Sequence, residues 1–354
     1  MRLYVDARLQ WGSGIGRYVA SILPHMIAAR PDWTFLIGVQ DGNSHPELQR
    51  LEQAANVTIL PLPIAPFSPA EQIHLERRLG DHDLAWFTNY WVPLFWRGPV
   101  VATVHDLIHL RPELYPAPRL KRLASRLVFE QLRRKARALI FVSEFTRNEF
   151  MQLIGPPRAG RVIHHGADHF PAAPVPFAKT PSALIVGAPK FHKNMRLAIE
   201  AWAEAAPPEP WHLTVVSPGD DLRSSVSLGA AARSVSFRSA IPNAELAQLY
   251  REAAFVMFPS RYEGFGLPIL EAALNGATIL SSTADALREV AREMEVTFLD
   301  PDDRGSWAAA IRKTVSQPLP THDRPDIARN IAAEERYRWK DAARETIETL
   351  IAAN

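Results

Sequence analysis

Short runs of apolar, β-branched and aromatic residues alternate along the whole chain with longer segments in which apolar residues recur every three or four positions. Runs of the first kind are typical of buried strands, and spacing of the second kind is typical of helices that cover a sheet. Strands and helices that alternate in this way predict an α/β fold with parallel sheets.

The first half of the chain predicts one Rossmann-like unit. Strands are expected at residues 3–7, 35–39, 57–60, 85–88, 100–104, 139–142 and 161–164. Helices are expected near residues 15–29, 69–79, 119–136 and 144–153. Helices that lie between strands in this order indicate a parallel sheet built from βα units.

The second half repeats this pattern after a proline-rich segment. Residues 171–181 hold four prolines, a composition typical of an extended linker. Further strands are expected at residues 183–186, 213–216, 235–237, 255–258, 278–280 and 297–299. We therefore expect two Rossmann-like domains, at residues 1–170 and 182–335, followed by a C-terminal helix at residues 336–354.

Length and composition narrow the class of protein. At 354 residues the chain exceeds the usual size of a single core, which agrees with two domains. It has no cysteine, which removes disulfides, thiolate metal sites and cysteine nucleophiles. Because the net charge is only +2, we expect no nucleic-acid partner. The strand-like start and the short apolar runs lead us to expect no export signal, no membrane span and a cytoplasmic location.

The segment PSRYEGFGLPILE, residues 259–271, follows an apolar strand and opens a helix. It places two carboxylates, Glu263 and Glu271, eight residues apart. Gly264 and Gly266 interrupt the first turn, so Glu263 is expected on the loop before the helix. Glycines let backbone N–H groups approach a ligand, and a helix N-terminus favours a negative group. The segment predicts a phosphate or sugar site; the alternative is that both acids are simply solvated.

A second segment, VGAPKFHKN at residues 186–194, combines a strand end, a glycine-bearing loop and cations at the start of a helix. Lys193 is suited to neutralise the charge that grows on a departing diphosphate. The alternative is an ordinary surface lysine at a helix start.

His105 and Asp106 end the apolar strand VVATVHD. Open α/β folds bind their ligands at the carboxyl edge of the sheet, where this pair is expected. The alternative is a histidine that only caps the end of the strand.

These segments, in this order, resemble the motifs of family 4 of the retaining, nucleotide-sugar-dependent glycosyltransferases, which have the GT-B fold. Residues 263–271 match the E-x7-E signature, and residues 187–194 are similar to the G-x-x-x-P-R-K-N pattern. The resemblance extends over nearly the whole chain. It implies two Rossmann-like domains that face each other across a cleft containing the active site. The C-terminal helix could pack on either domain, and a crossing back to the first is the expectation.

The resemblance also assigns roles to the motif residues. Glu263 would bind the hydroxyls of the donor sugar, Glu271 the ribose and Lys193 the phosphate. His105 would lie beside the sugar and the acceptor, with Asp106 orienting His105 or the acceptor. The other donor-binding residues that it implies are Gly14, Gly16, His192, Gly264, Phe265, Gly266 and Leu267. The implied catalytic residues are His105, Asp106, Lys193 and Glu263. The implied mechanism is front-face transfer of the sugar. The nucleotide-sugar is a co-substrate, and no cofactor is expected.

The chain departs from the family pattern at one phosphate-binding position. His192 stands where the family has Arg, and Phe191 stands where it has Pro. His192, Lys190 and Arg261 are therefore the three candidates for the second cation that binds the diphosphate.

The loop GSGIGR, residues 12–17, resembles the glycine-rich loop that family members place over the diphosphate and the acceptor. It also suggests an NAD-dependent dehydrogenase with Asp41 as the ribose ligand. However, the first strand ends near Ala7, whereas the dinucleotide turn needs its first glycine directly after the strand. A further alternative, a nucleotide-sugar-binding protein without catalysis, would have no need of the complete set of acids, lysine and histidine.

Asp81 and Asp83 have the D-x-D spacing with which another glycosyltransferase class holds a divalent ion. These two residues precede a strand instead of ending one. We therefore interpret them as a solvated turn and expect no metal.

The donor and the acceptor are less specified. The short chain and the sequence His192-Lys193-Asn194 are similar to those of bacterial mannosyltransferases that build surface polysaccharides from GDP-mannose. A UDP-sugar is the alternative donor. The first domain contains an aromatic-rich stretch with Trp86, Phe87, Tyr90, Trp91, Phe95 and Trp96. It also contains a basic segment with Arg119, Lys121, Arg122, Arg126, Arg133, Arg134, Lys135 and Arg137.

Flat aromatic faces suit sugars and the membrane interface, while Lys and Arg attract anionic lipid heads. One hypothesis is therefore a lipid-linked saccharide acceptor, with a peripheral contact at the inner face of the plasma membrane. The alternative is that the aromatic residues belong to the core and that the charges form a solvated face.

Overall fold

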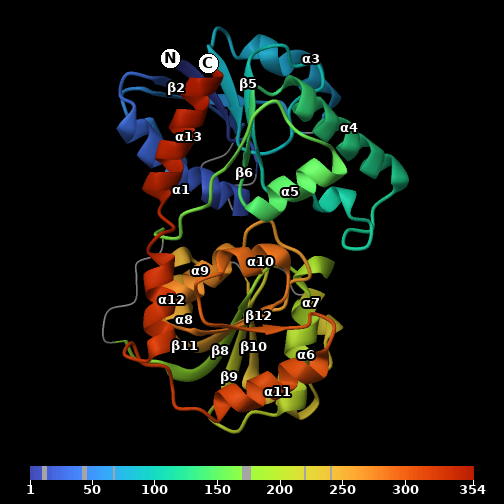
Figure 1. The fold of residues 1–354 in the computed structure, drawn as a ribbon, viewed down its shortest axis with the longest axis vertical. Coiled ribbons are helices and arrows are strands. Elements are labelled where there is room, and N and C mark those ends of the chain that lie inside the picture. The colour runs from blue at the N-terminus through green and yellow to red at the C-terminus, as the bar shows by residue number, and fades with distance from the viewer. Residues whose placement is uncertain (10–13, 42–45, 67, 170–176, 219–220, 240) are drawn as a thin grey trace. The chain divides into compact units, whose positions relative to one another are not determined.

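The computed structural model describes residues 1–9, 14–41, 46–66, 68–169, 177–218, 221–239 and 241–354. The chain divides into two compact units. Figure 1 shows the whole chain coloured from the N-terminus to the C-terminus. Unit 1 comprises Met1–Pro112, Pro116–His169 and Tyr337–Asn354, and unit 2 comprises Glu113–Tyr115 and Phe170–Arg336.

Unit 1 is built on a seven-stranded parallel sheet in the order β3-β2-β1-β4-β5-β6-β7. Its strands are β1 (Arg2–Asp6), β2 (Thr34–Gln40), β3 (Val57–Leu62), β4 (Leu84–Phe87), β5 (Val100–Val104), β6 (Ala138–Phe141) and β7 (Gly160–Val162). Its helices are α1 (Gly14–Ala29), α2 (Pro46–Glu52), α3 (Pro69–Arg78), the 3-10 helix η1 (Ile108–Leu110), α4 (Arg119–Lys135), α5 (Glu144–Leu153) and α13 (Trp339–Ala353).

Unit 2 is built on a six-stranded parallel sheet in the order β10-β9-β8-β11-β12-β13. Its strands are β8 (Thr180–Val186), β9 (His212–Val216), β10 (Val235–Arg238), β11 (Ala253–Phe258), β12 (Thr278–Ser282) and β13 (Val296–Leu299). Its α-helices are α6 (Met195–Ala205), α7 (Asp221–Ser225), α8 (Asn243–Glu252), α9 (Leu267–Leu274), α10 (Asp285–Val290), α11 (Arg304–Val315) and α12 (Pro325–Glu334). The 3-10 helices of this unit are η2 (Phe191–Lys193) and η3 (Gly229–Ser234).

The central strands of both sheets are apolar along their whole length. Every residue of β5 and of β11 is buried. Strands that helices cover on both faces read as continuous apolar runs, as in parallel sheets generally. The predicted α/β class is therefore confirmed, with two Rossmann-like units.

The C-terminal helix α13 packs on unit 1, beside α1 (Figure 1). The positions that recur at steps of three or four, Trp339, Ala343, Ile347 and Leu350, are all buried. The expected return of this helix to the first unit is thus confirmed, and its apolar stripe is the reason.

One strand begins earlier than expected. β8 starts at Thr180, inside the segment that we interpreted as a linker, because Thr180 pairs with Ala253 of β11. Pro181 stands at the second position of this strand, near the end, where a missing N–H costs the ladder least. More than half of the expected linker, residues 171–176, lies outside the described residues.

Candidate functional site

The sheet of unit 2 has a topological switch point between β8 and β11. The chain proceeds from β8 outward to β9 and β10, and from β11 outward to β12 and β13 in the opposite direction. Ligands of open α/β sheets bind at the carboxyl ends of the strands beside such a point. The segment after β8 carries Lys193, and the loop after β11 carries Glu263, so the fold brings the two predicted motifs together.

Lys193 and Glu263 form an ion pair at this switch point. The Lys193 Nζ lies 2.7 Å from both carboxylate oxygens of Glu263. The Ser260 hydroxyl donates to Glu263 Oε1 at 2.7 Å. The side chains of Lys193 and Glu263 are 27% and 16% exposed, so the pair is partly buried but reaches solvent. The carboxylate is therefore oriented from two sides, and the ammonium remains accessible to a charged ligand.

Asn194 ties the two loops to each other. Its backbone has a φ of +52°, in the left-handed region that Asn adopts more readily than most residues. Its Nδ2 donates to the carbonyl oxygens of Pro259 at 3.1 Å and Pro301 at 2.7 Å, and its Oδ1 accepts from Arg261 Nη1 at 2.6 Å. The backbone N–H of Arg261 donates to the carbonyl of His192 at 2.7 Å. These bonds hold Lys193 and Glu263 at a defined separation.

Gly266 allows the turn between the Glu263 loop and α9. Its φ is +110°, a conformation that favours glycine, and a Cβ at this position would also lie 2.5 Å from Leu287 Cδ2, which would have to move. Glu263 precedes α9, as expected, whereas Glu271 lies within it and is 1% exposed. Phe265 is also buried. The structure thus separates a partly exposed first acid from a buried second one, and a ribose contact of Glu271 stays a prediction.

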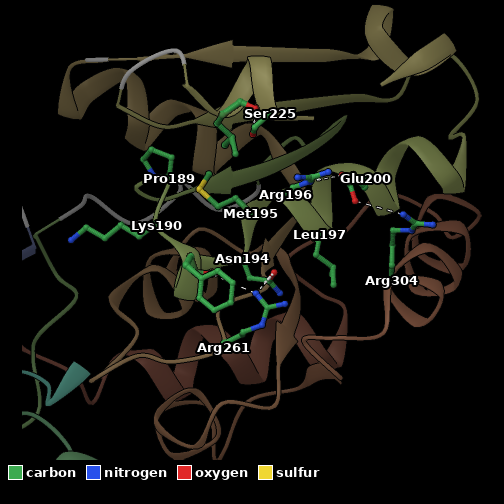
Figure 2. Close-up of a pocket in the computed structure, with 12 residues that line it drawn as sticks. Pro189, Lys190, Asn194, Met195, Arg196, Leu197, Glu200, Ser225, Arg261 and Arg304 are labelled. Carbon is green, nitrogen blue, oxygen red and sulfur yellow. Dashed lines mark hydrogen bonds and ion pairs between the residues drawn. The ribbon is translucent and has the colours of Figure 1, made fainter. Parts of the chain in front are cut away.

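A cavity of about 470 Å³ lies beside this network, and Figure 2 shows the side chains that line it. Arg261 points toward Asn194 there, and its Nη2 also binds Asp302 Oδ1 at 2.7 Å. Its guanidinium lies 4.9 Å from the centre of the Phe191 ring. Lys190 and Arg261 both line the cavity, whereas His192 is buried. Of the three candidates for the second phosphate cation, Lys190 and Arg261 are therefore the more accessible.

In unit 1, His105 and Asp106 directly follow β5, at the carboxyl edge of the sheet. The Nε2 of His105 lies 2.8 Å from the carbonyl oxygen of Thr88, which can only accept, so the ring proton is on Nε2. Burial lowers the pKa of His105, although the Thr88 carbonyl and Asp106 raise it. The imidazole is therefore neutral at pH 7, and its Nδ1 is an acceptor. Asp106 Oδ1 accepts from the backbone N–H of Ile108 at 3.1 Å.

A buried ionic network at the end of β1 was missed by the sequence analysis. Arg8 binds Asp6 through Nε at 3.0 Å and Nη2 at 2.6 Å, and its Nη2 also lies 2.5 Å from Glu71 Oε1. Asp6, Arg8 and Glu71 are each at most 5% exposed. The indole N–H of Trp91 donates to Glu71 Oε2 at 2.7 Å. Charged residues at and just after the end of the first strand were the signal available in the sequence, but nothing there indicated Glu71 as their partner.

This network lies at the switch point of unit 1, between β1 and β4. The Thr88 hydroxyl, just after β4, donates to the carbonyl of Asp6 at 2.7 Å, and Thr88 is also the partner of His105. The ionic network and the His105 site are therefore joined through one residue.

The glycine-rich segment is described in part. β1 ends at Asp6, whereas the first glycine of the segment is Gly12, so no glycine directly follows the strand as in a dinucleotide-binding fold. This spacing argues against the dehydrogenase hypothesis. Gly14 is exposed and Gly16 is buried, and Gly12 lies outside the described residues.

Comparison with known families agrees with this geometry. A family model described as "Glycosyltransferase Family 4" matches residues 12–169, and one described as "Glycosyl transferases group 1" matches residues 180–317. The chain belongs to glycosyltransferase family 4.

Individual relatives and structures are similar over most of the chain. The glycosyltransferase is 27% identical to O-antigen chain mannosyltransferase B of Escherichia coli over 307 residues, which cover 78% of each chain. It is 29% identical to glycogen synthase of Mycobacterium tuberculosis over 271 residues, 73% of this chain and 64% of the relative. The crystal structure of Anabaena Alr3699/HepE in complex with UDP and glucose matches with a TM-score of 0.76 at 18% identity, over 99% of this chain and all of the other. This structural match shows the GT-B fold.

The aromatic-rich stretch of the glycosyltransferase is largely core. Trp86 and Phe87 are fully buried, and Trp96 is 2% exposed and stacks on Tyr4. For these three residues the core alternative holds and the surface hypothesis does not, because Trp86 and Phe87 lie on the central strand β4 and Trp96 packs against the core. Phe95, at 66% exposure, does face solvent.

The D-x-D pair and the helices bear on the expectations of no metal and no membrane span. Asp83 precedes β4, and its Oδ2 accepts from the backbone N–H of Arg2 at 2.7 Å, so the D-x-D pair does not end a strand. Among the described residues, no group of three or more His, Asp or Glu side chains is placed to hold a metal ion. None of the helices in the described part of the chain combines the length and apolarity needed to cross a bilayer.

Proposed function

We propose that this glycosyltransferase moves mannose from GDP-mannose to a saccharide acceptor, with retention of configuration, in polysaccharide or glycoconjugate synthesis. The main support is the Lys193–Glu263 pair at the switch point of unit 2, where a cation and an oriented carboxylate meet at the ligand-binding edge. The similarity to O-antigen chain mannosyltransferase B favours mannose. A UDP-sugar donor is the alternative, favoured by the UDP-bound structure of the same fold.

Unit 2 performs the donor half of the proposed reaction. The bond between the sugar C1 and the phosphate oxygen breaks, and negative charge grows on the departing diphosphate. The Lys193 ammonium neutralises this charge, so the proposed reaction needs no divalent ion. The Glu263 carboxylate, oriented by Ser260, accepts hydrogen bonds from the sugar hydroxyls.

Unit 1 supplies the acceptor half. The acceptor oxygen forms the new bond to C1 on the face that the phosphate leaves, and its proton passes to the leaving phosphate oxygen. His105, neutral and with Nδ1 unprotonated, accepts a hydrogen bond from a sugar hydroxyl and is not the nucleophile.

Donor choice can be measured by thermal shift and turnover. We expect GDP and GDP-mannose to raise the melting temperature, because a ligand at 100 times its Kd stabilises the folded state by about 2.7 kcal/mol. UDP, UDP-glucose and NAD at equal concentrations should shift it less. Donor hydrolysis or transfer should persist in EDTA.

Each other outcome has a distinct meaning. A UDP-selective shift would keep the enzyme class and replace the donor, and a shift with NAD alone would contradict the function. Binding of GDP-mannose without hydrolysis or transfer, with any acceptor tried, would favour the non-catalytic alternative. Loss of activity in EDTA, restored by Mg²⁺, would contradict metal independence.

The acceptor in this proposal is a lipid-linked saccharide, reached through peripheral contact of α4 with the cytoplasmic face of the plasma membrane. Leu120, Leu123 and Leu127 recur at helical spacing on α4 and are 77%, 54% and 54% exposed. The residues of α4 that face the core are Ser125, Val128, Phe129 and Leu132. The three leucines therefore lie on the face of α4 turned away from the core of unit 1, where they expose apolar surface to water.

Basic residues flank this leucine face. The exposed cations of α4 are Arg119, Lys121, Arg126, Arg134 and Lys135. Lys135 Nζ donates to the Leu94 carbonyl at 2.8 Å, and Gln131 Nε2 donates to the Pro93 carbonyl at 2.8 Å, so the exposed Phe95 lies near the C-terminal end of α4. An apolar face flanked by cations is the pattern of helices that lie in the interface of anionic membranes.

Vesicle flotation tests this contact. We expect the protein to float with phosphatidylglycerol vesicles and to remain below with phosphatidylcholine vesicles. Leu123→Gln with Leu127→Gln should lower binding about tenfold or more, since burying one leucine contributes roughly 1.5 kcal/mol. Ile351→Gln, at a 51% exposed position of α13, is the matched control and should bind as the parent does. Absence of wild-type binding to anionic vesicles would remove the membrane contact.

A further inference from the structure

His105 belongs to a cluster of rings in unit 1 that also includes Tyr18, His165 and Trp339. Tyr18 of α1 contacts His105 edge-on at 5.0 Å between ring centres and also contacts His165 at 4.9 Å. His105 and His165 are 5.5 Å apart. Trp339, the first residue of α13, stacks on His165 at 5.6 Å with an angle of 25°, and lies 5.9 Å from Tyr18. The C-terminal helix therefore contributes one ring to the cluster that contains the histidine at the end of β5.

The segment after β7 is shaped to receive Trp339. The backbone N–H of Trp339 donates to Asp168 Oδ1 at 2.8 Å, and its indole N–H donates to His169 Nδ1 at 3.2 Å. A Cβ at Gly166 would lie 2.2 Å from the backbone nitrogen of Trp339, so any larger residue would displace the start of the helix. Since Trp339 is 1% exposed, its position is set by these contacts and not by solvent.

The same contacts help to bury His165 and Tyr18, the two rings that pack on the partly buried His105. Burial is the main cause that lowers the pKa of both His105 and His165. The charged or titratable neighbours that act on the pair are Asp106, which raises the pKa of His105, and His164 and His169, which lower that of His165. Tyr18 is neutral, because burial raises its pKa. Loss of the Trp339 ring would admit water beside His165 and Tyr18, the two rings that pack on His105.

We propose that Trp339 is a positioning residue for His105, and that α13 must be docked through it for the acceptor half of the reaction. This inference rests on the proposed role of His105. Trp339 does not touch the reacting atoms in this proposal; it holds His165 and Tyr18, which fix the plane of the His105 ring, while the Thr88 carbonyl fixes its proton on Nε2.

The test compares four variants. Trp339→Leu removes the ring, Trp339→Phe keeps a smaller ring, and Gly166→Ala displaces the same backbone from the other side. Trp33→Leu is the matched control, because Trp33 is a buried tryptophan of unit 1 outside the cluster. We expect Trp339→Leu and Gly166→Ala to lower kcat about 10-fold to 100-fold, the scale of a small misplacement of a reacting group. Trp339→Phe should recover most of the loss, and Trp33→Leu should keep the parent kcat per folded molecule.

The pH dependence separates positioning from stability. Hydration raises the pKa of His105 toward 6.5, so the acid limb of the kcat profile should move to higher pH in Trp339→Leu. An NMR titration of the histidine rings, with His105→Gln for assignment, measures the same change without catalysis. It therefore tests the inference even if the wild type transfers no sugar, an outcome that would count against the proposed function alone. A folded Trp339→Leu protein with parental kcat, or with lowered kcat and an unchanged His105 pKa, would overturn the positioning role.

Discussion

Lys193→Ala is expected to lower turnover about 100-fold, or about 2.7 kcal/mol, the typical loss when one preorganised electrostatic stabiliser is removed from a transition state. The ammonium sits at the carboxyl edge between β8 and β11 and is held 2.7 Å from both oxygens of Glu263. Because the ion pair exists before the donor binds, little reorganisation is needed when charge develops on the diphosphate. The loss should therefore appear in kcat more than in donor affinity, and stopped-time donor hydrolysis measures it.

Three further variants sharpen this test. Lys193→Arg keeps the charge but not the point geometry and should recover part of the turnover. Glu263→Gln keeps the shape of the carboxylate but removes its charge. The turnover of this variant shows how much of the loss in Lys193→Ala could arise from the effect of that substitution on Glu263. Lys313→Ala, at an exposed position of α11, controls for the general loss of a lysine. Unchanged turnover in Lys193→Ala would contradict the phosphate role.

Arg8→Met is expected to lower the free energy of unfolding of unit 1 by about 3–5 kcal/mol, because it leaves two buried carboxylates without their cation. Asp6 and Glu71 are 2% and 1% exposed, and Arg8 binds both. Urea unfolding followed by tryptophan fluorescence measures the loss. The expected loss of stability is large because the two carboxylates are buried. A carboxylate at the surface would instead be solvated by water when its partner is removed.

Two comparisons isolate this effect. Adding Asp6→Asn and Glu71→Gln to Arg8→Met removes the stranded charges and should recover much of the stability. Arg30→Met breaks an ion pair with Asp32 that is partly open to solvent, with side-chain exposures of 26% and 60%, and should cost much less than Arg8→Met. An Arg8→Met protein as stable as the Arg30→Met protein would show that the network contributes nothing to folding.

The strand pattern was readable from the sequence because each buried strand is apolar along its length. The expected strands at residues 100–104 and 255–258, for example, correspond to β5 and β11. The turn chemistry was equally local, and it placed Glu263 on the loop before α9. The aromatic stretch was left open between surface and core for a related reason: an aromatic run looks the same whether its strand is central or exposed, and only packing places Trp86 in the core.

The sequence by itself determined the α/β class, the two-unit division and the two motifs that carry the proposed donor chemistry, since these depend on periodicity and on residues close in the chain. The tertiary structure alone decided which distant residues meet. Lys193 and Glu263 are 70 positions apart, Arg8 and Glu71 are 63 apart, and Trp339 and His169 are 170 apart. Their pairing depends on strand order and helix docking, and buried charges and rings are stabilised only where that order supplies a partner.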